Sequence, residues 1–200
     1  MIPALGMLLA PVCFAETDDP HRHHRAMAES SAQDRSIARY DIPDLTMVDQ
    51  NGRDVVVTDL FDTDRPVMVN FIFTTCTTIC PMMASIFQQV QVGLADDAED
   101  VLMVSVSIDP EQDTATELAE YAGRFRAGPQ WHFLTGTLDD SIALQQAFEA
   151  YRGDKMNHAP MTLLRGRADS NWVRFDGFAS ARELEREVRS ELQKNMEDHS

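Results

Sequence analysis

Cys76 and Cys80 are the residues of this chain whose types and spacing could do chemistry. They stand in the stretch NFIFTTCTTICPMM at residues 70–83, directly after an apolar run and directly before Pro81. On a helix, side chains four positions apart lie on one face with about 5–6 Å between their Cβ atoms. Such a pair can close a disulfide after a modest adjustment, or bind one soft metal ion between two thiolates. The alternative is that both thiols are buried as small hydrophobic groups.

The position and spacing of the cysteines favour chemistry over burial. The apolar run predicts a strand that ends near Phe73, so the pair leads into the N-terminus of a helix, where free backbone N–H groups stabilise a thiolate. The Cys-x-x-x-Cys spacing leaves more room for an ion than the Cys-x-x-Cys of thiol–disulfide oxidoreductases, without preventing disulfide exchange. Two thiolates alone suit Cu(I), and a third ligand would exclude Zn²⁺, which prefers four.

His158 is the candidate for that third ligand. It lies in GDKMNHAPMTLL, a loop that enters a predicted core strand, and Pro160 is a candidate cis-proline in the same loop. A single loop histidine is by itself more often an ordinary polar residue. The thioredoxin-like fold predicted below places His158 near the cysteines, and this placement favours the ligand role.

Periodicity and turn signals predict the elements that position these residues. Two β-rich runs flank Asn51-Gly52, a strong hairpin signal, and apolar runs at 66–73 and 101–108 are typical of strands buried on both faces. Four helices are predicted: from Pro81 to about Gly93, from the Thr114/Glu117 capping box to about Arg126, over 139–150 and over 180–195. Three further strands are predicted at WHFLTG, MTLLR and WVRFDGF. This order predicts an α/β fold: a thioredoxin-like sandwich, with a central mixed sheet flanked by helices and an N-terminal β-hairpin.

The chain divides into three predicted parts. Residues 1–15 are an apolar run ending in Cys13-Phe14-Ala15, which resembles a signal peptide with its cleavage site, or a truncated membrane anchor. Residues 16–39 are predicted to form a flexible leader whose His21, His23 and His24 either capture Cu(II) loosely or have no function. Residues 40–196 are predicted to form one monomeric domain. We therefore expect an exported, periplasmic protein, with a membrane tether as an alternative, in which paired thiols are oxidised, bind metal or alternate between these states.

Composition and charge exclude some classes of function. The chain has 200 residues, of which 44% are hydrophobic and 25% charged, values typical of a globular protein. Its formal net charge of −16 repels phosphate groups. Nucleic acid is thereby excluded as a partner, and anionic lipid headgroups are disfavoured.

Three segments in order resemble the Sco/SenC family of copper-handling, thioredoxin-fold proteins. The stretch at 70–83 is similar to the family's Cys-x-x-x-Cys-Pro site, VSIDPEQDTATELAEYAGRF at 106–125 to its second signature, and WHFLTG at 131–136 to its third. His158 occupies the position of the family's histidine ligand. The resemblance implies that Cys76, Cys80 and His158 bind copper, as Cu(I) or Cu(II). It also implies delivery of copper to, or thiol reduction at, the dinuclear copper site of a respiratory cytochrome oxidase.

Competing functions remain open on the sequence alone. The first is a metallochaperone without turnover, whose partners are the copper-site subunit of the oxidase and other copper or thiol carriers. The second is a thiol–disulfide oxidoreductase, in which Cys76 attacks a partner disulfide and Cys80 resolves the mixed disulfide. A peroxidase ranks below both, because no arginine lies near the cysteines in the sequence. His158 separates the first two, since only copper binding needs it. Asp109, in the second signature, is expected to cap the turn before Pro110, with orientation of a ligand as the alternative.

Overall fold

The computed structural model describes residues 34–168 and 170–198, with side chains to residue 195. These residues form an eight-stranded sheet in the order β1-β8-β7-β4-β5-β6-β2-β3. Strands β4, β5 and β6 are parallel to one another, and the remaining pairings are antiparallel. The strands are β1 Asp34–Ala38, β2 Thr46–Asp49, β3 Asp54–Val56, β4 Val67–Ile72, β5 Leu102–Ser107, β6 Trp131–Thr135, β7 Met161–Arg165 and β8 Trp172–Asp176.

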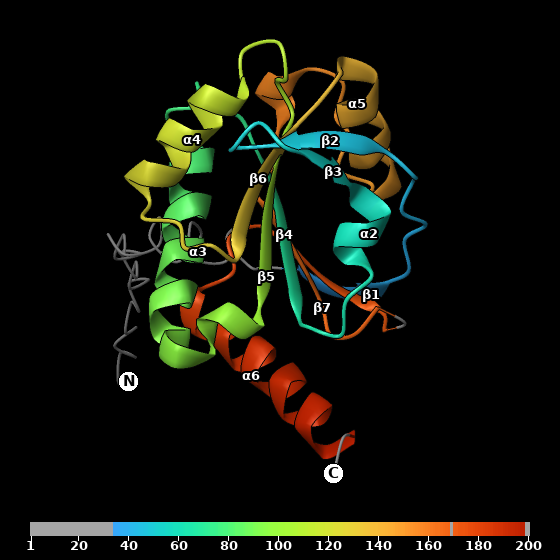
Figure 1. Ribbon diagram of the computed structural model, residues 1–200, viewed down its shortest axis with the longest axis vertical. Helices are drawn as coiled ribbons and strands as arrows, with labels where there is room; N and C mark the ends of the chain where they lie inside the picture. Colours follow the sequence, from blue (N-terminus) through green and yellow to red (C-terminus); the bar gives the residue numbers. More distant parts are fainter. Residues whose placement is uncertain (1–33, 169, 199–200) are drawn as a thin grey trace, which may run out of the picture. The chain divides into compact units, whose positions relative to one another are not determined.

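Helices cover both faces of the sheet, as Figure 1 shows. Those on one face are α3 Ile79–Leu94, α4 Ala115–Arg124 and α6 Ala181–Asp198. Those on the other are α2 Val57–Phe61 and α5 Leu138–Ala147. Two short 3₁₀ turns complete the fold, η1 Ala95–Asp100 and η2 Lys155–Asn157. The mixed sheet flanked by helices confirms the predicted α/β, thioredoxin-like fold. Within the described residues, no helix combines the length and apolar character needed to cross a membrane.

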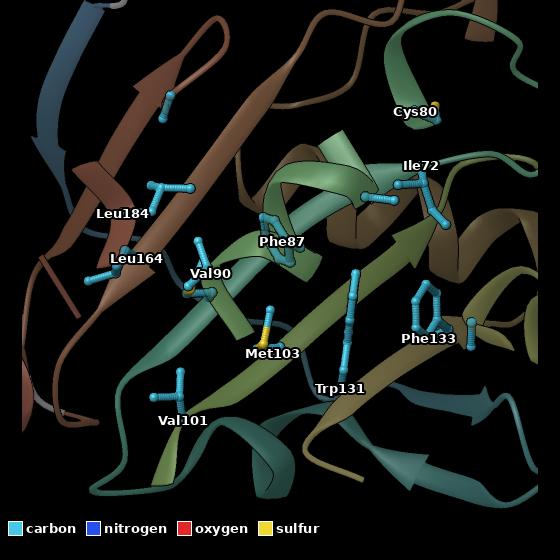
Figure 2. Close-up of a cluster of buried hydrophobic side chains, with 14 of the residues drawn as sticks. Ile72, Cys80, Phe87, Val90, Val101, Met103, Trp131, Phe133, Leu164 and Leu184 are labelled. Atoms are coloured by element: carbon cyan, nitrogen blue, oxygen red, sulfur yellow. The ribbon is translucent and has the colours of Figure 1, made fainter. Parts of the chain in front are cut away.

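The alternation of side chains along the central strands builds a core on each face. Because successive residues of a strand point to opposite sides, each fully buried strand contributes side chains to two cores. Figure 2 shows the core beneath α3 and α6, which contains Ile72, Met103, Trp131, Phe87 and Leu184. The core on the α2 and α5 face contains Val69, Phe71, Val104, Phe148 and Trp172. Burial on both faces fixes the ends of β4 and β5, from which the site residues emerge.

Local sequence signals account for the helix boundaries near the site. The Thr114 side chain accepts a hydrogen bond from the Glu117 N–H and caps α4, as the sequence predicts. Helix α6 approaches α3 closely at Gly93, where a Cβ atom would lie 2.5 Å from the Glu185 carboxylate. The carboxylate end of Glu185 therefore occupies the space beside Gly93.

Three expectations differ from the structure. The sheet begins at Asp34 rather than near Tyr40, because β1 pairs with β8; the part of the leader from residue 34 is therefore ordered, whereas residues 1–33 lie outside the described part. The hairpin β2–β3 is confirmed, but its second run ends at Val56 and continues as α2. The peptide bonds of the described residues are all trans, so Pro160 is not a cis-proline.

Candidate metal and redox site

The two cysteines lie at the junction between β4 and α3. The strand ends at Ile72 and the helix begins at Ile79, so Cys80 is in the first turn while Cys76 precedes the helix. The predicted arrangement of both side chains on one helical face is therefore wrong. Instead, the Cys80 N–H donates a hydrogen bond to the Cys76 sulfur over 3.4 Å. Because the N-cap Thr78 makes no side-chain cap, the Cys76 sulfur takes that place at the helix N-terminus.

The surroundings of the two thiols push their pKa values apart. Partial burial opposes ionisation of Cys76, but hydrogen bonds from the Cys80 and Thr78 backbones outweigh it and lower the pKa of Cys76. Burial raises the pKa of Cys80 far above the ordinary range, against the opposing effect of a hydrogen bond from the Phe73 N–H to its sulfur at 3.4 Å. Cys76 is half-buried, Cys80 is fully buried, and both are free thiols. The pair therefore consists of one accessible thiol that ionises more easily than an ordinary thiol and one buried thiol that ionises less easily.

His158 reaches the same region from the loop between α5 and β7. It follows directly after η2, and its ring lies 6.3 Å from the Phe73 ring, centroid to centroid. Burial, with a smaller opposing effect of a hydrogen bond with the Phe71 backbone, lowers the pKa of His158 and favours the neutral imidazole. Its Nε2 atom is buried and has no hydrogen-bond partner. A neutral imidazole with one unused buried nitrogen is suited to bind a metal ion.

A cavity of about 260 Å³ joins the two loops. Its lining includes Cys76 and His158, together with Phe73, Lys155 and Met156. Cys80 lies behind this surface, in the core beneath α3. Within residues 34–168 and 170–198, no three His, Cys, Asp or Glu side chains are gathered tightly enough to hold a metal ion as they stand. The structure thus brings Cys76 and His158 to one cavity and leaves Cys80, the third predicted ligand, in the core behind it.

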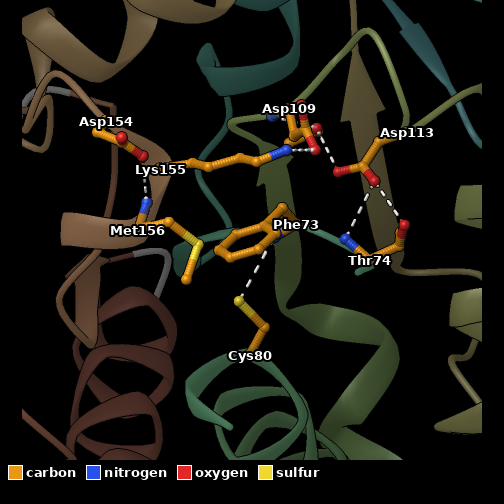
Figure 3. A network of polar contacts seen from close by, with 9 residues as sticks. Phe73, Thr74, Cys80, Asp109, Asp113, Asp154, Lys155 and Met156 are labelled. Carbon is orange, nitrogen blue, oxygen red and sulfur yellow. Dashed lines mark hydrogen bonds and ion pairs between the residues drawn. The ribbon is translucent and has the colours of Figure 1, made fainter. Parts of the chain in front are cut away.

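A polar network that the sequence analysis missed supports both loops (Figure 3). The buried Asp113 carboxylate accepts hydrogen bonds from the Thr74 N–H at 3.0 Å, the Thr74 hydroxyl at 2.5 Å and the Ser107 hydroxyl at 2.6 Å. Asp109 pairs with Lys155 rather than capping its own turn, and the nitrogen–oxygen distance is 2.5 Å. Asp113 lies within the second signature, and this position could have indicated a role at the site. For Lys155, the sequence offered only its closeness to His158.

The fold and the site together define a thioredoxin-like protein with an asymmetric cysteine pair and a facing histidine. The chain matches the SCO1/SenC family over residues 35–193, and it belongs to that family. A SCO1 protein homolog of Bacillus subtilis is 34% identical over 104 residues, which are 52% of this chain and 53% of that protein. A putative copper-binding protein of Stutzerimonas stutzeri is 33% identical over 107 residues, 53% and 50% of the two chains. The chain thus spans about half the length of these relatives.

Solved structures show the same fold. A SCO1/SenC family lipoprotein from Bacillus anthracis superposes with a TM-score of 0.67 at 21% identity, over 78% of this chain and 96% of that one. BsSco, described as a member of the Sco family of cytochrome c oxidase assembly proteins with a disulfide switch, gives a TM-score of 0.66 at 26% identity, over 78% and 95%. The family's relatives thus include a lipoprotein and a protein of oxidase assembly.

Proposed function

We propose that this chain is an exported copper-binding metallochaperone, in which Cys76, Cys80 and His158 bind the copper ion. Thiolate sulfur and imidazole nitrogen are donors that copper prefers, and a set of three is one short of the four that Zn²⁺ favours. The observation that carries the proposal is the buried, unpartnered Nε2 of His158, a residue that lines one cavity together with Cys76. A buried polar atom without a partner is costly unless something else binds it.

Copper loading requires two local changes. The Cys80 thiol must lose its proton, which its burial opposes in the metal-free protein, and its sulfur must turn from the Phe73 N–H towards the cavity. A bound cation favours this ionisation, because a thiolate and not a thiol is the ligand. Cys76 loses its proton more easily than an ordinary thiol, because its pKa is lowered, and His158 is held in the neutral form that binds metal. Cys76 and His158 are therefore the expected first ligands and Cys80 the last.

The partner of the transfer is proposed from the family. BsSco is described as a cytochrome c oxidase assembly protein, and we propose the same destination here, with copper delivered to, or thiols maintained at, the copper site of a respiratory oxidase. The Bacillus anthracis relative is described as a lipoprotein, which supports an exported and membrane-associated location. Residues 1–33, on which the predicted export signal depends, lie outside the described part of the chain.

An anaerobic Cu(I) titration against a competing chelator tests the copper site. We expect one tightly bound Cu(I) per reduced chain, and at least a tenfold loss of affinity, about 1.4 kcal/mol, in His158→Ala. His132→Ala is the matched control, because His132 is also half-buried, has an unpartnered ring nitrogen and lies on β6, away from the cavity lining. Affinity no better than that of a simple dithiol, and unaffected by His158→Ala, would exclude the three-ligand site.

Thiol–disulfide exchange is the second candidate, and the asymmetry of the two thiols favours it. The Cys76 thiolate would attack one sulfur of a partner's disulfide, forming a mixed disulfide and releasing the partner's other sulfur as a thiolate. Cys80 would then lose its proton and attack the Cys76 sulfur, leaving a Cys76–Cys80 disulfide and a fully reduced partner. This reaction does not use His158. Reduction of a disulfide peptide at the same rate by wild type and His158→Ala, together with weak copper binding, would favour this function over the first.

A further inference from the structure

The loop that carries His158 has little buried surface. It runs from the end of α5 to β7, and most of its residues between 151 and 160 are exposed. Its regular structure is limited to the three-residue turn η2. Only Lys155, His158 and Pro160 in this stretch are partly buried. Exposed segments with little buried apolar surface open readily, so the position of His158 depends on specific polar contacts.

Lys155 makes contacts in two directions that connect His158 to the rest of the fold. Its ammonium group pairs with the Asp109 carboxylate, as Figure 3 shows. The same group lies 5.8 Å from the centre of the Phe73 ring. Its backbone carbonyl accepts a hydrogen bond from the His158 N–H at 3.1 Å. Lys155 thus binds His158 through its main chain and Asp109, two residues after the end of β5, through its side chain.

Asp109, the partner of Lys155 in this contact, is held firmly in place. Asp109 is 7% exposed, and its N–H donates to the Ser107 hydroxyl at 3.0 Å. Its carbonyl accepts from the N–H groups of Gln112 and Asp113 at 3.0 and 2.9 Å. Ser107 in turn donates to Asp113, which holds Thr74 in the cysteine loop. The Lys155–Asp109 pair therefore fastens the histidine loop to the same group of residues that holds the cysteine loop.

We propose that Lys155 is a positioning residue, which holds His158 at the cavity before copper arrives. The inference rests on the proposed copper site. The apparent affinity for a ligand falls in proportion to the fraction of free molecules whose site is correctly arranged. Loss of the Lys155 contact would allow the loop to open, so fewer metal-free molecules would present the imidazole beside Cys76. The contacts between copper and its ligands in the loaded protein would be unchanged.

A direct effect of the positive charge is the competing explanation, and the two make different predictions. An ammonium group near the cavity would stabilise thiolates whether or not His158 is present. Positioning acts only through His158, so it disappears when the imidazole is removed. A double-mutant cycle between positions 155 and 158 therefore separates them.

The cycle compares four reduced proteins in the Cu(I) competition titration: wild type, Lys155→Gln, His158→Ala and the double variant. We expect Lys155→Gln to weaken binding about fivefold to tenfold in the presence of His158, and less than twofold in its absence. Lys155→Arg should restore most of the affinity. Lys194→Gln is the matched control, because Lys194 also pairs with a carboxylate, Glu191, but on α6. Equal losses in both backgrounds, or no loss from Lys155→Gln, would overturn the inference.

Hydrogen exchange of the metal-free protein tests the positioning without copper. The His158 amide should exchange faster in Lys155→Gln than in wild type, and Lys155→Arg should restore its protection. Unchanged exchange would refute the role of Lys155 even if copper binds as proposed. Conversely, if wild type binds no copper tightly while the amide is deprotected in Lys155→Gln, the proposed function fails and the structural role of Lys155 stands. A tenfold loss in His158→Ala with none in Lys155→Gln would retain the copper site and reject the positioning.

Discussion

Replacing Asp113 by alanine is expected to destabilise the protein and to loosen the loop that carries Cys76. The carboxylate is fully buried and accepts three hydrogen bonds, two from Thr74 and one from Ser107. Thr74 lies in the cysteine loop between β4 and α3, and Ser107 ends β5. The substitution therefore removes the common acceptor that fastens this loop to the sheet.

The loss in the free energy of unfolding depends on whether each donor that loses Asp113 can hydrogen-bond to water instead. A hydrogen bond to a charged group contributes about 1.5–3 kcal/mol when buried. Ser107 is fully buried, so its loss counts in full at about 2 kcal/mol. Thr74 is half-buried, so water can replace much of its bonding, and about 0.5 kcal/mol remains for each of its two bonds. The total is about 3 kcal/mol, and Asp113→Asn, which keeps one acceptor oxygen, should cost about half as much.

Urea unfolding followed by circular dichroism measures this cost, with the dependence on urea concentration expected to stay unchanged. Alkylation of Cys76 with iodoacetamide reports the loop, and it should be faster in Asp113→Ala at constant pH. Glu111→Gln is the control, because Glu111 is exposed in the same segment and should change stability by less than about 0.5 kcal/mol. A loss below about 1 kcal/mol in Asp113→Ala, with unchanged alkylation, would refute the assignment of Asp113 as the anchor of the loop.

Three further predictions follow from the site and the core. Mass spectrometry after iodoacetamide treatment should show Cys76 alkylated at a lower pH than an ordinary thiol and Cys80 protected until urea is added, whereas equal reactivity would contradict the opposite shifts of their pKa values. Because burial lowers the pKa of His158, the unfolded chain binds more protons below about pH 6.5, so stability falls as the pH drops through this range. The advantage of wild type over His158→Asn in urea unfolding should therefore shrink from pH 7 to pH 5, and a constant difference would argue against a buried neutral imidazole. Leu184→Ala, at a fully buried position where α6 meets α3, should cost about 2–5 kcal/mol and leave the alkylation rate of Cys76 unchanged.

The sequence by itself determined the elements and the chemical types at the site. The continuous apolar runs and the Thr114 capping box predicted the central strands and the start of α4, because these signals depend on residues close together in the chain. The same local signals failed where long-range pairing decides the outcome. Strand β1 exists because β8 offers it an edge, and its polar sequence carries no signal of that edge.

The different environments of the two thiols were decided only by the tertiary structure. Spacing predicted one shared helical face, yet the helix begins between the two residues, so Cys76 caps its N-terminus while Cys80 points into the core. The predicted order of elements indicated the placement of His158, but it gave no sign of Lys155, the residue that fastens the histidine loop. Lys155 and Asp109 are separated by 46 positions, and no local pattern links a lysine in one loop to a carboxylate after a strand. Such contacts arise when the packed sheet brings loops together, since the free energy of a polar contact depends on burial and geometry that only the folded chain supplies.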